Sequence, residues 1–504
     1  MRSVGVFVLL LASAPLSAQT AAPLHRAAAS ITEADVKRRI GIIADDSMMG
    51  RDTPSRGLEL TARYVADQFR RFGLRPAGDD GSWFVRYPVT RRRLELKDSK
   101  VVFRVGSDSV LATFDRNARH ERGTVPTGPV SAPTVLVGGT LGPDDVKRLA
   151  LRDKIVLLAL DYARQNPESL TLVARALRLA APKAVIQLLD TDSATFASSI
   201  PRNATVHPAV DLKLVSPPFV AVPRSALASL LPKAGVNPSE VAASPRPVFR
   251  ELPSLGVRLE MKDSVLSKVM APLTVGALEG TDPVLKKEYL LFSAHMDHIG
   301  ITPGKPDSIN NGADDDGSGT VGVIELAEAF SRAGARPKRS LLFLTVSGEE
   351  KGLWGSRYFS EHPTVPLSQI VADLNMDMIG RNWPDTIVAI GKEHSDLGAT
   401  LNRVNAAHPE LGMTAIDDIW PEEQFYFRSD HYNFARKGVP ILFFFNGVHP
   451  DYHQVTDSPD KINGEKEARV LRLIFYLGQE IANAPDRPKW NPESYKQIVD
   501  EDGS

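Results

Sequence analysis

The chain has 504 residues, of which 42% are hydrophobic and 24% are charged, and its formal net charge at pH 7 is −1. Its length predicts two domains, and its composition is typical of a soluble globular protein with a sizeable core. A net charge near zero offers no electrostatic basis for binding nucleic acid or an anionic membrane surface, and the lack of cysteine excludes disulfides and thiolate chemistry.

Residues 1–18 have the pattern of a secretory signal. Arg2 precedes an apolar stretch from Val4 to Leu11, and small residues follow up to Ala18. The apolar stretch is too short to span a bilayer, and no later segment has the uninterrupted apolar length of a membrane span. We therefore expect cleavage near Ala18 and a periplasmic or secreted mature protein.

The next part of the chain predicts a helical segment, a strand region and an insert. Residues 19–30 are small and polar and are expected to form a flexible leader, whereas the pattern over 33–73 is helical. Strand-like alternation covers 83–104. Within 122–250, prolines become frequent and short apolar strands alternate with a helix around 170–179. These residues are expected to form an inserted, smaller, β-rich module.

Residues 251–485 alternate between apolar strands and amphipathic helices. The expected strands are 289–294, 340–346, 370–375, 386–390 and 439–445, and the expected helices are 319–333, 354–361, 394–407, 431–437 and 465–484. This pattern predicts an α/β domain with a mixed, mostly parallel sheet flanked by helices. Its expected parts are residues 30–121 and 251–485, followed by a polar tail at 486–504. In such sheets, ligands bind beyond the carboxyl ends of the strands.

Five candidate metal ligands lie in loops beside the expected strands. They are His295, Asp315, Glu350, Asp377 and His453. Two imidazoles and three carboxylates, with no thiol, suit a pair of hard or borderline divalent ions such as Zn²⁺. Two such ions in hydrolases lie roughly 3.5–4 Å apart and stabilise both the attacking and the leaving oxygen. The sequence therefore predicts two metal ions in one cleft.

Residues next to these ligands have expected roles of their own. Asp297 is a candidate partner for the second ring nitrogen of His295. Glu349 precedes the ligand Glu350, and because adjacent side chains diverge, one can bind metal while the other accepts a proton from the attacking water. His298 is interpreted as a polar residue at the end of a strand, without a role in the site.

The segment 311–319 places three aspartates directly before an expected helix. This crowding costs like-charge repulsion unless a cation compensates for it. An EF-hand calcium loop is excluded, because in that register Gly312 stands at the first ligand position and Val323 stands where the final glutamate belongs. One of the three aspartates is therefore expected to bridge two metal ions.

Taken together, these segments resemble peptidase family twenty-eight, the dizinc exopeptidases that include bacterial leucyl aminopeptidases and glutamate carboxypeptidase. The resemblance covers Met48-Met-Gly-Arg51, the helix up to Gly73 and most of 252–484. It implies a zinc exopeptidase fold of the aminopeptidase type. It also implies that the insert, residues 122–250, is a protease-associated domain.

The resemblance implies two Zn²⁺ ions per chain, held by ligand sets that share one carboxylate. The first ion is expected at His295 and Asp377, the second is expected at Glu350 and His453, and Asp315 bridges them. No position of this set departs from the family pattern. An inactive, receptor-like relative is therefore not expected.

The resemblance also implies three catalytic roles, with Glu349 as the general base, Asp297 as the partner of His295, and Tyr452 as a donor to the oxyanion. The predicted function is an exported aminopeptidase that removes N-terminal residues from peptides. Carboxypeptidase or dipeptidase action, glutaminyl cyclisation on a related fold, and peptide binding without catalysis stay open. The sequence indicates neither the oligomeric state nor the preferred side chain, because five aromatic residues either line an apolar pocket or belong to the core: Trp383, Trp420, Phe425, Tyr426 and Phe427.

Overall fold

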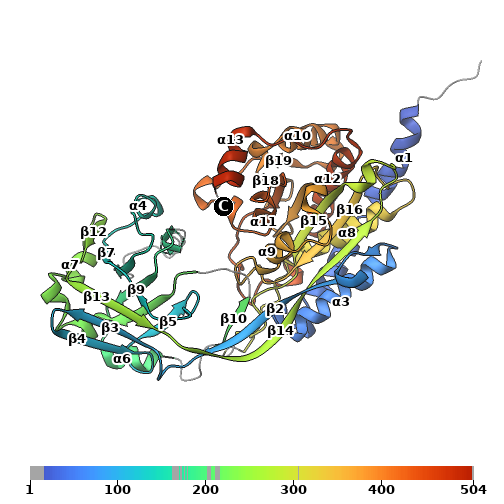
Figure 1. Cartoon of the computed structure of the whole chain (residues 1–504). Helices are drawn as coiled ribbons and strands as arrows, with labels where there is room; N and C mark the ends of the chain where they lie inside the picture. Colours follow the sequence, from blue (N-terminus) through green and yellow to red (C-terminus); the bar gives the residue numbers. More distant parts are fainter. Residues whose placement is uncertain are drawn as a thin grey trace, which may run out of the picture. The chain divides into compact units, whose positions relative to one another are not determined.

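The chain forms two compact units, Met1–Tyr87 with Met270–Ser504, and Pro88–Val269. The computed structural model describes residues 16–161, 170, 173, 174, 176–178, 180–200, 206–210, 216–302, 304 and 306–501. Two long neighbouring strands, β2 (Phe84–Leu94) and β14 (Asp263–Leu278), carry the chain between the units (Figure 1). The expected signal segment lies outside the described residues apart from its last three positions.

The first unit is built on one mixed sheet. After β14 the strands follow in the order β16 (Ser340–Val346), β15 (Tyr289–His295), β17 (Ile370–Met376), β20 (Ile441–Phe445), β18 (Thr386–Ile390) and β19 (Thr414–Ile416). The four central strands, from β16 to β20 in this order, are mutually parallel, whereas β14 runs antiparallel to β16, and β18 runs antiparallel to β20 and parallel to β19. The two-residue strand β1 (Arg75–Pro76) pairs with β14. The carboxyl ends of the central strands therefore meet at one edge of the sheet.

Helices cover both faces of this sheet. On one face, α2 (Glu33–Ile43), α8 (Gly317–Ser331) and α12 (Gly464–Asn483) pack with one another and share a core with Leu442 and Phe444 of β20. Phe443, between those two residues, points to the other face and stacks on His431 of α11 (His431–Ala435), with 4.3 Å between the ring centroids. The remaining helices of the unit are α1 (Leu16–Ala29), α3 (Arg56–Arg71), α9 (Trp354–Glu361), α10 (Leu397–Ala407) and α13 (Pro492–Tyr495).

Two expectations for the N-terminal part are wrong. Residues 22–29 belong to α1 instead of forming a flexible leader, because Ala27 and Ala28 are buried in the core of the unit. The expected helix over 33–73 is divided into α2 and α3 by the short 3-10 segment Asp46–Arg51. Gly50 has a positive φ of 64° there, and Pro54 has no backbone N–H for a continuous helix.

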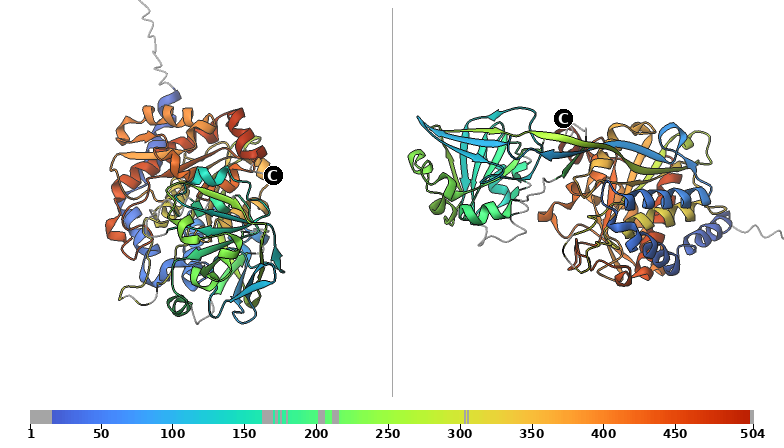
Figure 2. Two further views of the ribbon diagram at one scale, coloured as in Figure 1. Left: turned by 90° about the vertical axis from the view of Figure 1, so that its left-hand side faces the viewer. Right: turned by 90° about the horizontal axis from the view of Figure 1, so that it is seen from below.

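The second unit contains two sheets that share one core, and a further core lies on the other face of the larger sheet (Figure 2). The larger has the order β12 (Val248–Glu251), β7 (Thr134–Gly138), β8 (Ile155–Ala159), β9 (Ala184–Leu189), β11 (Phe219–Pro223) and β5 (Arg119–Arg122), with β7, β8, β9 and β11 parallel. The smaller has the order β4 (Asp108–Thr113), β3 (Lys100–Val105), β13 (Leu255–Glu260) and β6 (Val130–Ser131). A further strand, β10 (Val206–Val210), pairs with β2.

The second unit is longer than the insert expected at 122–250. Strands β3 and β4 precede that range and β13 follows it, yet all three belong to the smaller sheet of this unit. Its helices are α4 (Pro143–Lys147), α6 (Ser193–Ser199) and α7 (Pro238–Ala242), and the helix expected at 170–179 lies partly outside the described residues. That this unit is a protease-associated domain stays a prediction.

Within the described part of the chain, no helix combines the length and the hydropathy that a membrane crossing requires.

Candidate metal centre

The sheet of the first unit brings the candidate ligands to one edge. His295 is the last residue of β15, Glu350 follows β16, Asp377 follows β17, and His453 lies in the loop after β20. Asp315 comes from the segment that leads into α8. Because β15, β16, β17 and β20 are parallel, their carboxyl ends place these side chains together although they are far apart in the sequence.

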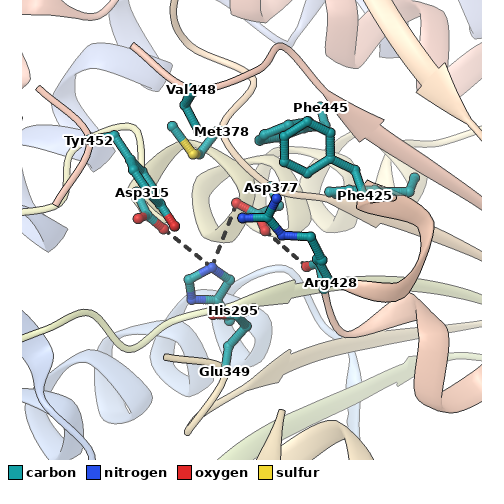
Figure 3. A pocket seen from close by; sticks show the side chains of 12 residues that line it. His295, Asp315, Glu349, Asp377, Met378, Phe425, Arg428, Phe445, Val448 and Tyr452 are labelled. Atoms are coloured by element: carbon teal, nitrogen blue, oxygen red, sulfur yellow. Dashed lines mark hydrogen bonds and ion pairs between the residues drawn. The ribbon is translucent and has the colours of Figure 1, made fainter. Parts of the chain in front are cut away.

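Asp315 lies between two pairs of donor groups. Its Oδ1 is 3.4 Å from Nε2 of His295, and the same nitrogen is 3.6 Å from Oδ1 of Asp377 (Figure 3). Its Oδ2 is 3.1 Å from Nε2 of His453, which is 3.0 Å from Oε2 of Glu350. All five predicted ligands therefore come together, and each oxygen of Asp315 faces a different pair.

The charges and unpaired atoms of this cluster fit divalent cations. Among the described residues, Oδ2 of Asp315 and Nε2 of His453 are buried and have no hydrogen-bond partner. Burial alone would lower the pKa of His453, but Asp315 and Glu350 raise it to about 10. Burial opposes protonation of His295 too, yet carboxylates led by Asp377 hold its pKa well above the usual value. The carboxylates thus favour positive charge on both imidazoles, and a metal ion can supply that charge in place of protons.

The other two aspartates of the triplet hold the backbone around the ligands. The carboxylate of Asp316 accepts hydrogen bonds from the backbone N–H groups of His295 at 3.1 Å, of Met378 at 3.2 Å and of the first turn of α8. The carboxylate of Asp314 accepts one from the N–H of Gly380 at 2.7 Å. Only the middle aspartate faces the donor pairs, as the resemblance implied.

Asp297 contacts His295 through its backbone more closely than through its side chain. Nδ1 of His295 lies 3.1 Å from the carbonyl oxygen of Asp297 and 3.7 Å from its Oδ1. The Asp297 carboxylate instead accepts hydrogen bonds from the hydroxyl of Thr53 at 3.0 Å and from the N–H of Glu349 at 3.3 Å. The Asp297 side chain therefore lies beside His295, as expected, while its shorter contacts hold Thr53 and the backbone of Glu349.

Glu349 and Tyr452 line the same pocket as His295, Asp315 and Asp377 (Figure 3). Burial raises the pKa of the Glu349 carboxyl group well above its usual range, and it also raises that of the Tyr452 phenol. A carboxyl group with a raised pKa can accept and return a proton near neutral pH. A phenol with a raised pKa stays protonated and can donate a hydrogen bond.

The pocket has an apolar wall beside the donor groups. Its apolar residues are Met378, Phe425, Phe443, Phe445 and Val448. Of the five aromatic residues considered above, Phe425 lines this pocket. Trp420 packs against two residues of this wall, with its ring centroid 5.7 Å from that of Phe425 and 5.9 Å from that of Phe445. Trp383 stacks on Trp420, with 6.0 Å between the ring centroids. Arg428 also lines the pocket, and its guanidinium lies over the ring of Phe425 and pairs with Glu423 at 2.9 Å.

A third histidine, His298, lies in the cluster, although its place at the end of a strand had indicated a residue outside the site. His298 is fully buried, and its Nδ1 lies 2.8 Å from Oε1 of Glu350 and 3.7 Å from Oδ2 of Asp315. Potential ligand atoms of His298, Asp315 and Glu350 all lie within 4.8 Å of one another, as do those of His295, Asp315 and Asp377. Its place three residues after His295, just beyond the same strand, is the sequence signal that could have identified it.

Comparison with known proteins finds a family model and relatives that match this part of the chain. The model of Peptidase family M28 matches residues 274–478. Leupeptin-inactivating enzyme 1 from Streptomyces exfoliatus is 31% identical over 183 residues, which cover 36% of this chain and 39% of that protein. A probable leucine aminopeptidase from Arthroderma benhamiae is 28% identical over 210 residues, which cover 40% and 56%. The chain thus spans about two fifths to just over half of the length of these relatives.

Solved structures share the fold over most of the chain. An aminopeptidase from Aneurinibacillus sp. strain AM-1 superposes with a TM-score of 0.51 at 19% identity, covering 93% of this chain and 98% of that one. A zinc aminopeptidase from Bacillus subtilis gives 0.50 at 17% identity, covering 90% and 96%. At these identities the likeness concerns the fold alone, and it confirms the predicted mostly parallel α/β architecture flanked by helices.

Proposed function

We propose that this chain, whose residues 274–478 match the model of Peptidase family M28, is an exported aminopeptidase that uses two Zn²⁺ ions to hydrolyse N-terminal residues from peptides. The observation that carries the proposal is the position of Asp315, whose two carboxylate oxygens face separate pairs of donor groups. The names of relatives and fold neighbours, which include zinc and leucine aminopeptidases, support the metal and the reaction.

The five predicted ligands would hold the two ions. His295 and Asp377 belong to one position, His453 and Glu350 belong to the other, and Asp315 contributes one oxygen to each. When bound, such a pair of ions lowers the pKa of water and polarises the scissile carbonyl group.

The residues of the chain supply the proton transfers and the orientation. Glu349 accepts the proton of the attacking water and returns it to the leaving amine. The carboxylate of Asp297 accepts a hydrogen bond from the backbone N–H of Glu349. This contact holds the Glu349 carboxyl group in its place in the pocket. The Tyr452 hydroxyl donates a hydrogen bond to the developing oxyanion, a contact whose removal typically costs about 10²–10³ in kcat.

The apolar wall of the pocket supports a preference for an apolar side chain at the cleaved residue. Phe425, Phe443, Phe445 and Met378 offer aromatic and thioether surface beside the metal ligands. Burial of an aliphatic side chain against such surface contributes about 1.5–3 kcal/mol. Leucyl and phenylalanyl substrates are therefore expected to react faster than alanyl or glycyl ones.

Export is part of the proposal. It is supported by the sequence pattern of Arg2, the apolar stretch up to Leu11 and the small residues ending at Ala18. N-terminal sequencing of the protein recovered outside the cytoplasm tests it. A mature chain that begins after residue 18, within a few positions, is the expected result, and an uncleaved chain retained in the cytoplasm would contradict export.

A panel of aminoacyl chromogenic substrates tests the activity. Each substrate is assayed with the protein as purified, after chelation, and after zinc is restored, beside an N-acetylated copy of the same compound. Hydrolysis of the free-amino series alone, lost on chelation and regained with zinc, is expected. Cleavage of N-acetylated peptides from the carboxyl end would instead establish a carboxypeptidase, and no hydrolysis with zinc present would reject the peptidase proposal.

A further inference from the structure

Glu350 lies between two imidazoles. On one side, Nε2 of His453 is 3.0 Å from Oε2 of Glu350. On the other side, Nδ1 of His298 is 2.8 Å from Oε1. The two rings meet edge to face, with their centroids 5.7 Å apart. Both nitrogens also lie near the same oxygen of Asp315, Oδ2, at 3.1 and 3.7 Å.

The short contact between His298 and Glu350 does not have the geometry of a hydrogen bond. In the part of the chain that the structure describes, neither ring nitrogen of His298 has a hydrogen-bond partner, and neither does Oε1 of Glu350. Both groups are nevertheless buried, and buried polar atoms without partners are costly. An imidazole nitrogen and a carboxylate oxygen this close together are a pair of atoms that one cation can bind at the same time.

The spacing of these atoms fits one shared cation. Zinc binds imidazole nitrogen at about 2.0–2.1 Å and carboxylate oxygen at about 2.0–2.2 Å, so two ligands of one ion are separated by about 3–3.4 Å at angles between about 90° and 110°. The distances from Nδ1 of His298 and Nε2 of His453 to the oxygens of Glu350 and Asp315, from 2.8 to 3.7 Å, lie around this range.

We propose that His298 is a ligand of the metal ion held by Glu350 and His453, which makes this position different from its neighbour. It would then have four protein residues as ligands: His298, His453, Glu350 and Asp315. The position beside His295 has three, the others being Asp377 and Asp315. A fourth protein ligand leaves this ion fewer places for water or substrate than its neighbour has, although catalytic zinc can expand to five ligands.

This inference rests on the proposed two-metal centre and predicts that its two positions are unequal. The position with His298 should release its ion more slowly and bind it more tightly. The position beside His295 should exchange its ion first and should have more open coordination places. A chelator is therefore expected to remove the two ions in two steps.

Cadmium-113 NMR tests the assignment without any substitution. The full chain, labelled with nitrogen-15 in its histidines, is loaded with two equivalents of ¹¹³Cd²⁺, and couplings between cadmium and imidazole nitrogen are recorded. One cadmium resonance should couple to two imidazoles and the other should couple to one. One imidazole on each cadmium would overturn the role of His298 and leave the two-metal proposal intact, whereas a single cadmium resonance would reject the two-metal centre itself.

Zinc titration calorimetry of variants gives a second, independent readout. His298→Asn is expected to weaken one of two zinc-binding steps by more than the roughly 10–100-fold that loss of a supporting residue causes, and to leave the other step unchanged. His431→Asn is the matched control, because His431 is also fully buried but bonds the carbonyl of Tyr426 at 2.7 Å. Equal zinc affinities in the wild type and His298→Asn would contradict the proposal.

Discussion

Asp457 holds the backbone of Asp315 in place. Its Oδ2 accepts a hydrogen bond from the N–H of Asp315 at 3.1 Å, across 142 residues of sequence. The same carboxylate accepts a hydrogen bond from the backbone N–H of Asp314, also at 3.1 Å. Asp457 lies in the same loop as His453, four residues further along the chain. Its buried carboxylate therefore connects the segment that carries Asp315 to the loop that carries His453.

Replacing Asp457 with alanine is therefore expected to weaken metal binding without removing a ligand. The substitution leaves two buried N–H groups unpaired and frees the segment that carries Asp315, so zinc affinity should fall about 10–100-fold, as it does when groups that orient ligands are lost. Competition with a chromogenic chelator measures this. Asp460→Ala, an exposed aspartate of the same loop, should bind zinc like the wild type. Equal zinc affinities of the two variants would show that Asp457 does not hold the metal ligands in place.

Glu349→Gln separates catalysis from metal binding. The amide has nearly the same shape as the carboxylate but cannot take up the proton of the attacking water, so kcat should fall by about 10²–10⁴. The zinc content should stay the same, because Glu349 is not among the predicted ligands. Metal analysis and steady-state kinetics on the same preparation check both expectations. Activity near the wild-type level would refute the role of Glu349 as the general base.

Arg51 is expected to be essential for the stability of the first unit. It is fully buried, and its guanidinium donates hydrogen bonds to the carbonyl oxygens of Met296, Ile43, Asn311 and Gly312 at 2.5–3.0 Å. A lysine ammonium cannot reach all four, because it is a single point donor instead of a planar fork. Each unpaired buried carbonyl costs about 1–3 kcal/mol. Arg51→Lys should therefore lose at least about 3 kcal/mol of unfolding free energy.

Denaturant unfolding measures the effect of the Arg51 substitution. Arg56→Lys is the matched control, because Arg56 is exposed at the start of α3, and its unfolding free energy should stay within about 0.5 kcal/mol of the wild type. If the two variants are equally stable, the buried guanidinium does not have the structural role that its contacts indicate.

Asp373 predicts a pH dependence of stability. Burial raises the pKa of its carboxyl group to about 8. It accepts one hydrogen bond, from the hydroxyl of Ser293 at 2.8 Å, and its second oxygen has no hydrogen-bond partner within the described chain. An unfolded aspartate titrates near pH 3.9. The folded chain therefore binds this proton more tightly, and the contribution of Asp373 to the unfolding free energy falls as pH rises from about 4 through about 8.

Asp373→Asn removes this titration and should be stabilising at high pH. Each pKa unit corresponds to about 1.4 kcal/mol, so the advantage of the variant over the wild type should grow by several kcal/mol between pH 5 and pH 8. Unfolding free energies at several pH values within this window measure it. Asp385→Asn, an exposed aspartate, should differ from the wild type by the same amount at every pH. A constant difference for Asp373→Asn would contradict the buried-carboxyl explanation.

The sequence predicted the sheet of the first unit well because its central strands are continuous apolar runs. The bounds of β16 and β18 agree with the expected ranges, and α9 does as well. The break between α2 and α3 was not predicted, since the helical spacing continues on both sides of Gly50 and Pro54. The extent of the second unit was not predicted either, because strand pairing between β3 and β13 joins segments about 150 residues apart, and no local pattern records it.

For the site, the sequence predicted which residues meet but not how all of them point. The five candidate ligands could be predicted because their motifs follow apolar strands in the order of the family that the sequence resembles. The contact between His298 and Glu350 was not predicted, because a histidine just beyond a strand has the same local sequence pattern whether it faces solvent or a residue far along the chain. The contacts of the Asp297 carboxylate with Thr53 and with the N–H of Glu349 were not predicted for a similar reason, since both come from distant segments.

Anomalous scattering from crystals of the zinc-loaded protein, recorded at the zinc absorption edge, tests the central claim most directly. The account predicts two peaks roughly 3.5–4 Å apart, one beside His295 and Asp377 and one beside His453 and Glu350, with the carboxylate of Asp315 between them. A single peak, or peaks away from Asp315, would contradict the two-metal centre and the peptidase mechanism built on it.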